Sequence, residues 1–163
     1  MRFRRDILFL AAVLSLAASI VSCQPDEGCR QNMNVSAGVT LRGLATDSAD
    51  VETPFSSWDS ITVQGVDNDS LLYDNSKLIS QLQLPLHNDT GITVYRLTWH
   101  NTEDKLYFHH DNTMQFVSMA CGCIIYHTID SVWCEGTWID SVKIINSAVE
   151  SVQQENVKIY CSY

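Results

Sequence analysis

The 163-residue sequence has few basic residues, few glycines and few prolines. Ten Lys and Arg stand against 19 Asp and Glu, a formal net charge of −9, which argues against a nucleic-acid-binding protein because phosphate contacts need clustered positive charge. Seven Gly and three Pro exclude collagen-like and low-complexity chains. Since 45% of the residues are hydrophobic, the composition is that of a globular protein.

Recognisable catalytic motifs are also missing. The sequence contains no G-x-S-x-G, no H-E-x-x-H, no P-loop and no G-x-G-x-x-G. Paired carboxylates of the kind glycosidases use leave no local motif, and nothing in the sequence points to them. We therefore predict a protein that is not an enzyme and that has no catalytic residues, no resident metal and no cofactor.

The main apolar run is too short to cross a membrane as a helix. It covers residues 7–22 without a charge or a proline, whereas a spanning helix needs about 20 apolar residues. Arg2, Arg4 and Arg5 precede it, which is the arrangement of a secretory signal peptide. The alternative is an N-terminal helix packed in a core, but such a helix should carry a polar stripe that this run lacks.

The run ends in Ile20-Val21-Ser22-Cys23, which resembles the lipobox of bacterial lipoproteins. The resemblance implies cleavage between Ser22 and Cys23, a diacylglycerol on the Cys23 thiol, and a further acyl chain such as palmitate on the new N-terminus. Two or more acyl chains anchor a protein stably, whereas one does so marginally. The alternative is ordinary signal-peptidase cleavage, which leaves Cys23 for a disulfide.

The residues after Cys23 bear on where the protein resides. The acidic segment Gln24–Glu27 is similar to the surface-export signal of Bacteroidota lipoproteins, and the alternative is a plain solvated tether. We expect an outer-membrane lipoprotein, on either the periplasmic or the surface face.

Three segments follow from these predictions: a signal peptide at 1–22, a lipidated Cys and tether at 23–33, and one domain at 34–163. Cleavage removes three of the ten basic residues and one of the 19 acidic ones, so the net charge moves from −9 to −11.

Short alternating runs of β-branched and aromatic residues fill the domain. The expected strands lie near residues 34–42, 61–66, 91–100, 106–110, 116–119, 123–129, 139–145 and 157–161. We predict an all-β fold, a single β-sandwich of about seven to nine mostly antiparallel strands of the Ig-like, Greek-key type. A small closed barrel is the alternative.

Turn-forming residues separate these runs. The separators are Asp67–Asp69, His87–Asp89, Asn101–Asp104 and Asp111-Asn112. Residues 71–84 are expected to hold a short helix or an irregular crossover, and residues 43–57 a polar loop.

Several segments occur in an order that resembles one family. They are Cys29, Leu84-Pro85-Leu86, the SMACGC run at Ser118–Cys123, IDSVKIIN at Ile139–Asn146 and NVKIY at Asn156–Tyr160. The order is similar to that of a domain-of-unknown-function family of Bacteroidota cell-envelope lipoproteins. The resemblance implies a β-sandwich lipoprotein without an assigned activity, and a disulfide between Cys29 and Cys121.

Cys123, Cys134 and Cys161 depart from that family's pattern. Disulfides are the default in an oxidising compartment, but five thiols cannot all pair within one chain. Cys134–Cys161 and Cys123–Cys161 both stay open as second disulfides. Cys161 alternates with Val157 and Ile159, so we expect it to point inward.

A metal or redox site is the alternative use of these cysteines. Cys121-x-Cys123 and Cys134, with His127 nearby, offer soft ligands for Zn²⁺ or Cu⁺. The spacing is not the C-x₂-C of zinc knuckles, and no C-x-x-C precedes a helix as redox motifs require. We therefore expect no metal here.

The other candidate ligands have a structural explanation as well. His100, His109 and His110 are expected to be ordinary strand histidines, because His109 and His110 must face opposite sides of a strand. Asp67-x-Asp69 offers hard oxygens for Ca²⁺ but lacks the rest of an EF-hand loop, so solvated turn residues are expected.

An Asp-Ser pair followed by an aliphatic or small residue recurs along the chain. The triplet is similar to the O-glycosylation sequon of Bacteroidota envelope proteins, and Ser48 in the polar loop is its favoured site. Turn chemistry, in which Asp-Ser starts a strand, is the alternative.

The sequence predicts a lipid-anchored envelope module with a structural or interaction role. Its contact with the membrane is through the N-terminal lipid, it binds no nucleic acid, and a protein or glycan partner is unidentified. The alternative is a carbohydrate- or other ligand-binding module that uses Trp58, Trp99, Trp133 or Trp138 as a stacking platform. Trp exposed in a groove favours the second function. Trp99 is expected in the core, because it shares an apolar face with Tyr95 and Leu97.

Overall fold

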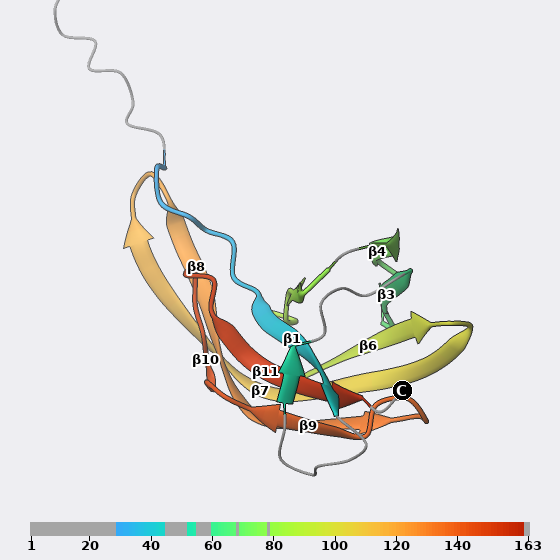
Figure 1. Ribbon diagram of the computed structural model, residues 1–163. Helices are drawn as coiled ribbons and strands as arrows, with labels where there is room; N and C mark the ends of the chain where they lie inside the picture. The colour runs from blue at the N-terminus through green and yellow to red at the C-terminus, as the bar shows by residue number, and fades with distance from the viewer. Residues whose placement is uncertain (1–28, 45–51, 55–59, 68, 78, 162–163) are drawn as a thin grey trace, which may run out of the picture. The chain divides into compact units, whose positions relative to one another are not determined.

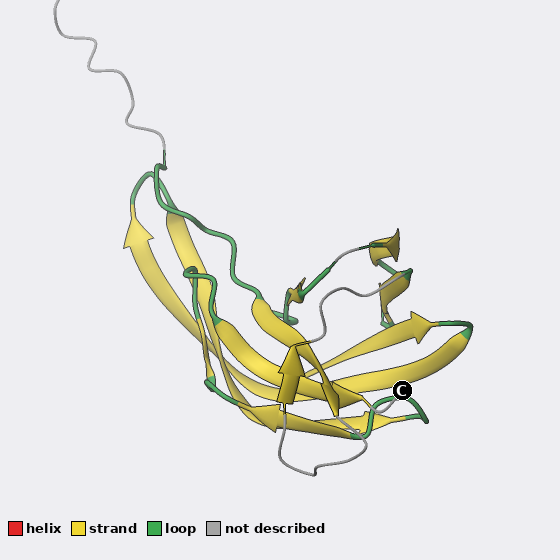
Figure 2. Cartoon of the chain, viewed as in Figure 1, coloured by secondary structure: helices red, strands yellow, loops and turns green. Residues whose placement is uncertain are grey.

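The computed structural model describes residues 29–44, 52–54, 60–67, 69–77 and 79–161 (Figure 1). Within these residues the chain consists of strands and loops and contains no helix (Figure 2). Its contacts form two compact units, a small one that includes residues 29–31 and 119–121 and a large one that holds the strands. The predicted all-β class is confirmed.

The strands of the large unit form two sheets. One sheet has the order β10 (Ala148–Val149), β8 (Gly122–Glu135), β7 (Thr102–Ser118), β6 (Ile92–Trp99), β3 (Ile61–Gly65) and β4 (Leu71–Ser76). The other has the order β2 (Glu52–Pro54), β1 (Ala37–Leu44), β11 (Glu155–Cys161) and β9 (Ser141–Ile144), and β5 (Gln81–Leu84) also pairs with β1. Among the described strands, only β1 and β11 pair in parallel.

The described residues contain eleven strands, more than the predicted number. The expectation of a helix or an irregular crossover at residues 71–84 is wrong, because β4 and β5 lie there. β4 is an edge strand with an exposed Leu71 and two register shifts against β3, so its sequence lacks a regular alternation. The predicted polar loop at 43–57 also contains the end of β1 and all of β2.

Two predicted turns lie elsewhere or are absent. β6 and β7 are joined by His100 and Asn101, which have positive φ values of 45° and 62°, as two-residue hairpin turns favour. The predicted turn at Asn101–Asp104 is therefore shifted, since Thr102 already pairs with Trp99. No turn forms at Asp111-Asn112, because β7 continues through both residues in regular pairing with β8. The nearby irregularity lies between His109 and His110, where β8 has one extra residue.

Buried apolar side chains from both sheets form one core. Alternation places Tyr95 and Leu97 of β6 and Leu106 and Phe108 of β7 in this core, as their spacing predicted. The other sheet contributes chiefly β1 and β11, with Val39, Leu41, Val157, Ile159 and Cys161 fully or nearly fully buried. The inward orientation predicted for Cys161 is confirmed.

A buried carboxylate closes the turn after β8. Asp104 is 1% exposed, and its oxygens accept hydrogen bonds from the backbone N–H groups of Thr137, Trp138 and Ile139 at 2.8 to 3.0 Å. Gly136 lies against this carboxylate with a φ of 152°, and a Cβ on it would overlap the Asp104 side chain. Three backbone donors that no ladder satisfies thus obtain an acceptor from a different strand.

The buried side chain of Asn156 links the parallel strands β1 and β11 to the segment that precedes β11. Asn156 is fully buried; its Oδ1 accepts the Gly38 N–H, and its Nδ2 donates to the carbonyls of Asn146 and Ala148 at 3.0 and 2.7 Å. The Gln154 carbonyl leaves no space for a Cβ on Gly38. The close approach at the irregular start of the β1–β11 ladder therefore requires glycine.

We expect Asp104→Ala to lower the free energy of unfolding by about 3 kcal/mol, because it leaves three backbone N–H groups without their charged acceptor. Urea unfolding followed by Trp fluorescence measures the change. Asp111→Ala removes an exposed carboxylate from the same strand and should change stability by less than about 0.5 kcal/mol. Equal effects of the two substitutions would contradict the role given to Asp104.

Candidate functional site

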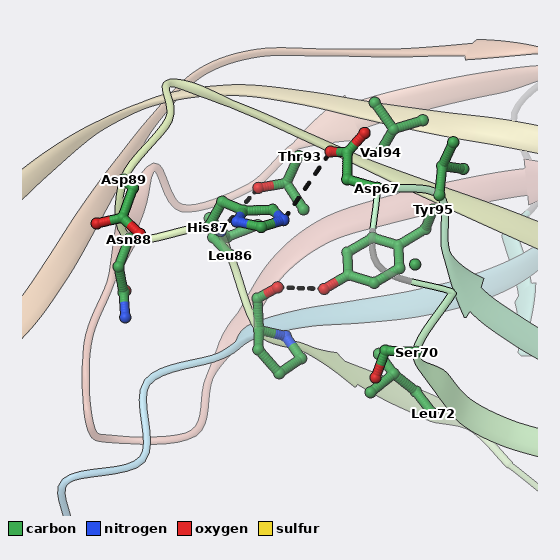
Figure 3. Close-up of a pocket in the computed structure, with 13 residues that line it drawn as sticks. Asp67, Ser70, Leu72, Leu86, His87, Asn88, Asp89, Thr93, Val94 and Tyr95 are labelled. Carbon is green, nitrogen blue, oxygen red and sulfur yellow. Dashed lines mark hydrogen bonds and ion pairs between the residues drawn. The ribbon is translucent and has the colours of Figure 1, made fainter.

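A cavity of about 250 Å³ lies beside the segment that connects β5 to β6. It is lined by the end of β3 and the residues after it, by Leu72 of β4, by Pro85–Asp89, and by Thr93–Tyr95 of β6 (Figure 3). Polar and apolar groups share the lining, with Asp67, Ser70 and His87 among the polar side chains. The cavity is therefore the first place to look for a ligand site.

Few charged groups converge on this cavity. The His87 Nε2 lies 3.9 Å from the Asp67 carboxylate, which is an ion pair when the imidazole is protonated (Figure 3). The Tyr95 hydroxyl donates a hydrogen bond to the Pro85 carbonyl. Burial raises the pKa of Tyr95, so the phenol stays protonated and keeps this bond.

The wall formed by residues 87–90 is held by the side chain of Asn112. Its Nδ2 lies 3.0 Å from the His87 carbonyl, 2.8 Å from the Asn88 carbonyl and 3.0 Å from the Thr90 carbonyl. Its Oδ1 lies 2.8 Å from His110 Nδ1 and 2.7 Å from His127 Nδ1. One amide of β7 therefore joins a loop to two buried histidines.

These contacts fix the protonation of both imidazoles. An amide oxygen only accepts hydrogen bonds, so the Nδ1 atoms of His110 and His127 must carry protons. His110 Nε2 lies 2.8 Å from Thr93 Oγ1. The Thr93 oxygen accepts the His87 N–H at 2.8 Å and donates its own proton to His110, which is neutral in this arrangement.

Burial keeps the two histidines neutral. His110 is 0% and His127 is 3% exposed, and their rings meet edge to face with centroids 5.2 Å apart. Desolvation lowers the pKa of His127 to about 4, with the neighbouring His110 as the second cause. Desolvation also lowers the pKa of His110, opposed by the hydrogen bond to Asn112. Both groups are poor proton acceptors at neutral pH.

Thr93, His110 and Asn112 share the hydroxyl–imidazole–amide order of a hydrolase triad. Thr93 is only 3% exposed, however, and its oxygen already accepts the His87 N–H. A nucleophile must be reached by a substrate, and burial keeps this oxygen away from solvent. The arrangement ties residues 87–90 to β7.

The cysteine predictions have a mixed outcome. The disulfide between Cys29 and Cys121, implied by the family resemblance, is confirmed. Cys123, Cys134 and Cys161 are thiols, so neither of the two second disulfides left open above forms. Cys123 is exposed whereas Cys161 is buried in β11, and the Cys134 thiol donates to the Ile139 carbonyl at 3.7 Å. Burial raises the pKa of both Cys134 and Cys161, which makes them weak nucleophiles.

The residues weighed as metal ligands do not gather. Cys121 is bound to Cys29, and His127 donates its Nδ1 proton to Asn112. Across the described part of the chain, no three His, Cys, Asp or Glu side chains lie close enough together to hold a metal ion. His109 and His110 face opposite sides of β7 as predicted, with His109 near Asp130 at 3.2 Å and His110 in the interior.

The tryptophans divide between core and surface. Trp138 is 7% exposed and lies in the core, and Trp99 packs against that core and stacks on His100 with centroids 4.4 Å apart. Trp133 is 38% exposed and stacks on Tyr107, with centroids 5.0 Å apart and planes within 4°. The Tyr107 hydroxyl donates to the Glu135 carboxylate at 2.8 Å.

Some predicted sites fall outside the described residues: Ser22, Cys23, Ser48 and Trp58. Where the chain is described, it contains no helix long and apolar enough to span a membrane.

Sequence reasoning missed Asn112, Asp104 and Asn156. The first two were placed in turn-forming clusters, which is where Asn and Asp most often lie. Their function depends on donors and acceptors far along the chain, such as the Asn112 bond to His87 across 25 residues. The one available signal was the interruption of an otherwise alternating strand by polar residues.

We expect His127 to make the protein less stable in mild acid. The folded pKa of about 4 lies below the ordinary value of about 6.5, so the unfolded chain takes up the proton first as the pH falls. Neutral His127 makes its full contribution to the free energy of unfolding above pH 6.5. We expect the free energy of unfolding to fall by about 2 kcal/mol between pH 8 and pH 5. Urea unfolding at the two pH values measures the loss, and His127→Gln should reduce it.

Thr128→Gln is the matched control, because Thr128 is exposed on the same strand and has no titratable group, so the pH dependence should stay unchanged. If the protein and its His127→Gln variant lose the same stability over this range, the assignment to His127 is wrong.

Comparison with known proteins identifies a family. A family model described as a family of unknown function, DUF6452, matches residues 60–161, which is more than half of the chain. No curated protein and no solved structure matches the chain. The match covers strands β3 to β11, including the Thr93, His110, Asn112 and His127 network. The chain belongs to DUF6452, a family of unknown function.

Proposed function

We propose that the chain is a lipid-anchored protein of the bacterial cell envelope with a structural or binding role. The observation that carries the proposal is the disulfide between Cys29 and Cys121. Disulfides persist in oxidising compartments outside the cytosol, and Cys29 follows the lipobox-like Cys23 by only six residues. An exported chain with a lipid on Cys23 accounts for both features.

The proposed domain is a β-sandwich of the Ig-like, Greek-key type. Two sheets that share one apolar core support it, and the antiparallel ladders that dominate both sheets agree with it. The cell of origin is a member of the Bacteroidota, the membrane is the outer membrane, and Ser48 carries an O-glycan. These statements rest on the sequence patterns at residues 20–27 and 47–49.

A non-catalytic role fits the polar groups of the domain. Thr93 and His110 are buried and hydrogen-bonded to each other, and His110 is also bonded to Asn112. The cavity beside them offers one weak pair, His87 and Asp67. A mature net charge of −11 disfavours nucleic acid as a partner.

A second candidate function, carbohydrate binding, is favoured by the Tyr107–Trp133 stack. The pair lies on the outward face of β7 and β8, and Glu135 beside it provides a carboxylate that can accept hydrogen bonds from sugar hydroxyls. An aromatic ring with an adjacent carboxylate is a common platform for the apolar face of a sugar. Trp99 and Trp138 pack in or against the core and contribute nothing to such a platform.

We expect Cys23→Ala to release the protein from membranes of a bacterial host, because it removes the thiol that carries the lipid. Fractionation followed by immunoblotting locates the protein, and intact mass confirms the loss of acyl chains. Cys123→Ala, which removes an exposed thiol far along the chain, should leave the protein in the membrane fraction. Retention of the Cys23→Ala protein would overturn the anchor.

If the domain binds carbohydrate through Trp133, Trp133→Ala should lower the affinity about tenfold or more, because it removes the contact area of one indole ring. Affinity electrophoresis in gels containing soluble α- or β-glucans measures the retardation. Leu71→Ala, at another exposed apolar position, serves as the control. The carbohydrate function fails if no glucan retards the unsubstituted protein or if both variants migrate as it does.

A further inference from the structure

The far end of the β7–β8 ribbon carries large apolar side chains that stay exposed among the residues that the structure describes. Met114 is 69% exposed and Phe116 is 58% exposed, and both lie outside the apolar core. They lie two residues apart on β7, so they share one face.

The partner strand extends this apolar face. Met114 pairs with Ile125 and Phe116 with Cys123, so all four side chains lie on the same side of the ribbon. Ile125 is half-buried and Cys123 is exposed. Further along the ribbon the same face carries Asn112 and His127, so it is the inward face of the sheet continued past the core.

The same part of β7 and β8 contains no charged side chain. No Asp, Glu, Lys or Arg occurs from Asn112 to Thr128, although the whole chain has 29 such residues. Asp111 and Asp130 are the nearest charged residues on either side. Transfer of a charged side chain out of water costs much free energy. A surface without charged side chains therefore has a small desolvation penalty when it is buried.

The disulfide brings this end of the ribbon close to the proposed anchor along the covalent chain. Six residues separate Cys23 from Cys29, which span at most about 22 Å when extended. Cys29 is bonded to Cys121, and Phe116 is five residues from Cys121, at most about 18 Å. Without this bond, 93 residues would separate Cys23 from Phe116.

We propose that Met114 and Phe116 insert into the lipid bilayer that holds the acylated Cys23. This inference rests on the proposed lipid anchor and adds a second, protein-based contact with the same membrane. The acidic chain gains nothing from anionic lipids, so the contact is apolar and does not require a charged headgroup. A protein partner and a second copy of the chain are the competing occupants of this surface.

The test uses the full, lipid-modified protein reconstituted in phosphatidylcholine vesicles at a low protein-to-lipid ratio. Phe116→Trp introduces a fluorescent ring at the proposed contact, and lipids brominated on the acyl chains quench Trp emission only when the ring reaches them. Leu71→Trp is the matched control, because Leu71 is 53% exposed and lies level with Lys105 in the sheet, about 36 Å from Phe116 along β7.

The emission added by Phe116→Trp should be lost in brominated vesicles, whereas the emission added by Leu71→Trp should not. Met114→Trp reports on the same face and replaces Phe116→Trp if that variant does not fold. Flotation of the vesicles separates the two proposals. Protein that floats without quenching of either reporter overturns the insertion and leaves the anchor in place, and protein that does not float overturns both. Emission of Phe116→Trp that is not quenched but changes as the protein is diluted assigns the surface to a second copy and also overturns the insertion.

Discussion

Antiparallel pairing joins β7 to β8 from Lys105 to Ser118, and three separate features of the protein depend on this ladder. Near its start, Leu106 and Phe108 enter the core shared by the two sheets. At its centre, Asn112 lies opposite His127 and brings both into the network that holds residues 87–90. Beyond its far end, Cys121 continues the chain into the disulfide with Cys29. A register slip of one residue would reverse the face of every side chain on the slipped strand, so all three features require the same register.

Polar side chains complete the backbone hydrogen bonds where strand pairing ends. Asp104 accepts from three N–H groups, Asn112 donates toward three carbonyls, and Asn156 serves one donor and two acceptors. Each of these side chains lies on a strand and satisfies the backbone of another segment. The whole chain has only seven Gly and three Pro, so long-range side-chain contacts satisfy backbone groups that turn residues often satisfy in other proteins.

His110 and His127 belong to one hydrogen-bonded network in the fold. His110 and His127 are neutral, desolvated and bound through their Nδ1 atoms to one amide oxygen. Buried polar groups stabilise a contact between a loop and a sheet only when each of them has a hydrogen-bond partner. The wall of the cavity therefore depends on groups that do not line it, since His110, Asn112 and His127 are absent from its lining.

Alternation in the sequence was enough to predict the all-β class, the buried faces of β6 and β7, the inward Cys161 and the opposed His109 and His110, because side-chain direction in a strand follows from position alone. The family resemblance supplied the Cys29–Cys121 pair, which spacing leaves open. The tertiary structure decided the rest: the continuous β7, the strands β4 and β5, the thiol state of Cys134 and Cys161, and the partners of Asn112. These features depend on contacts between residues that are far apart in the sequence. A periodic pattern of side chains within one strand carries no information about such contacts.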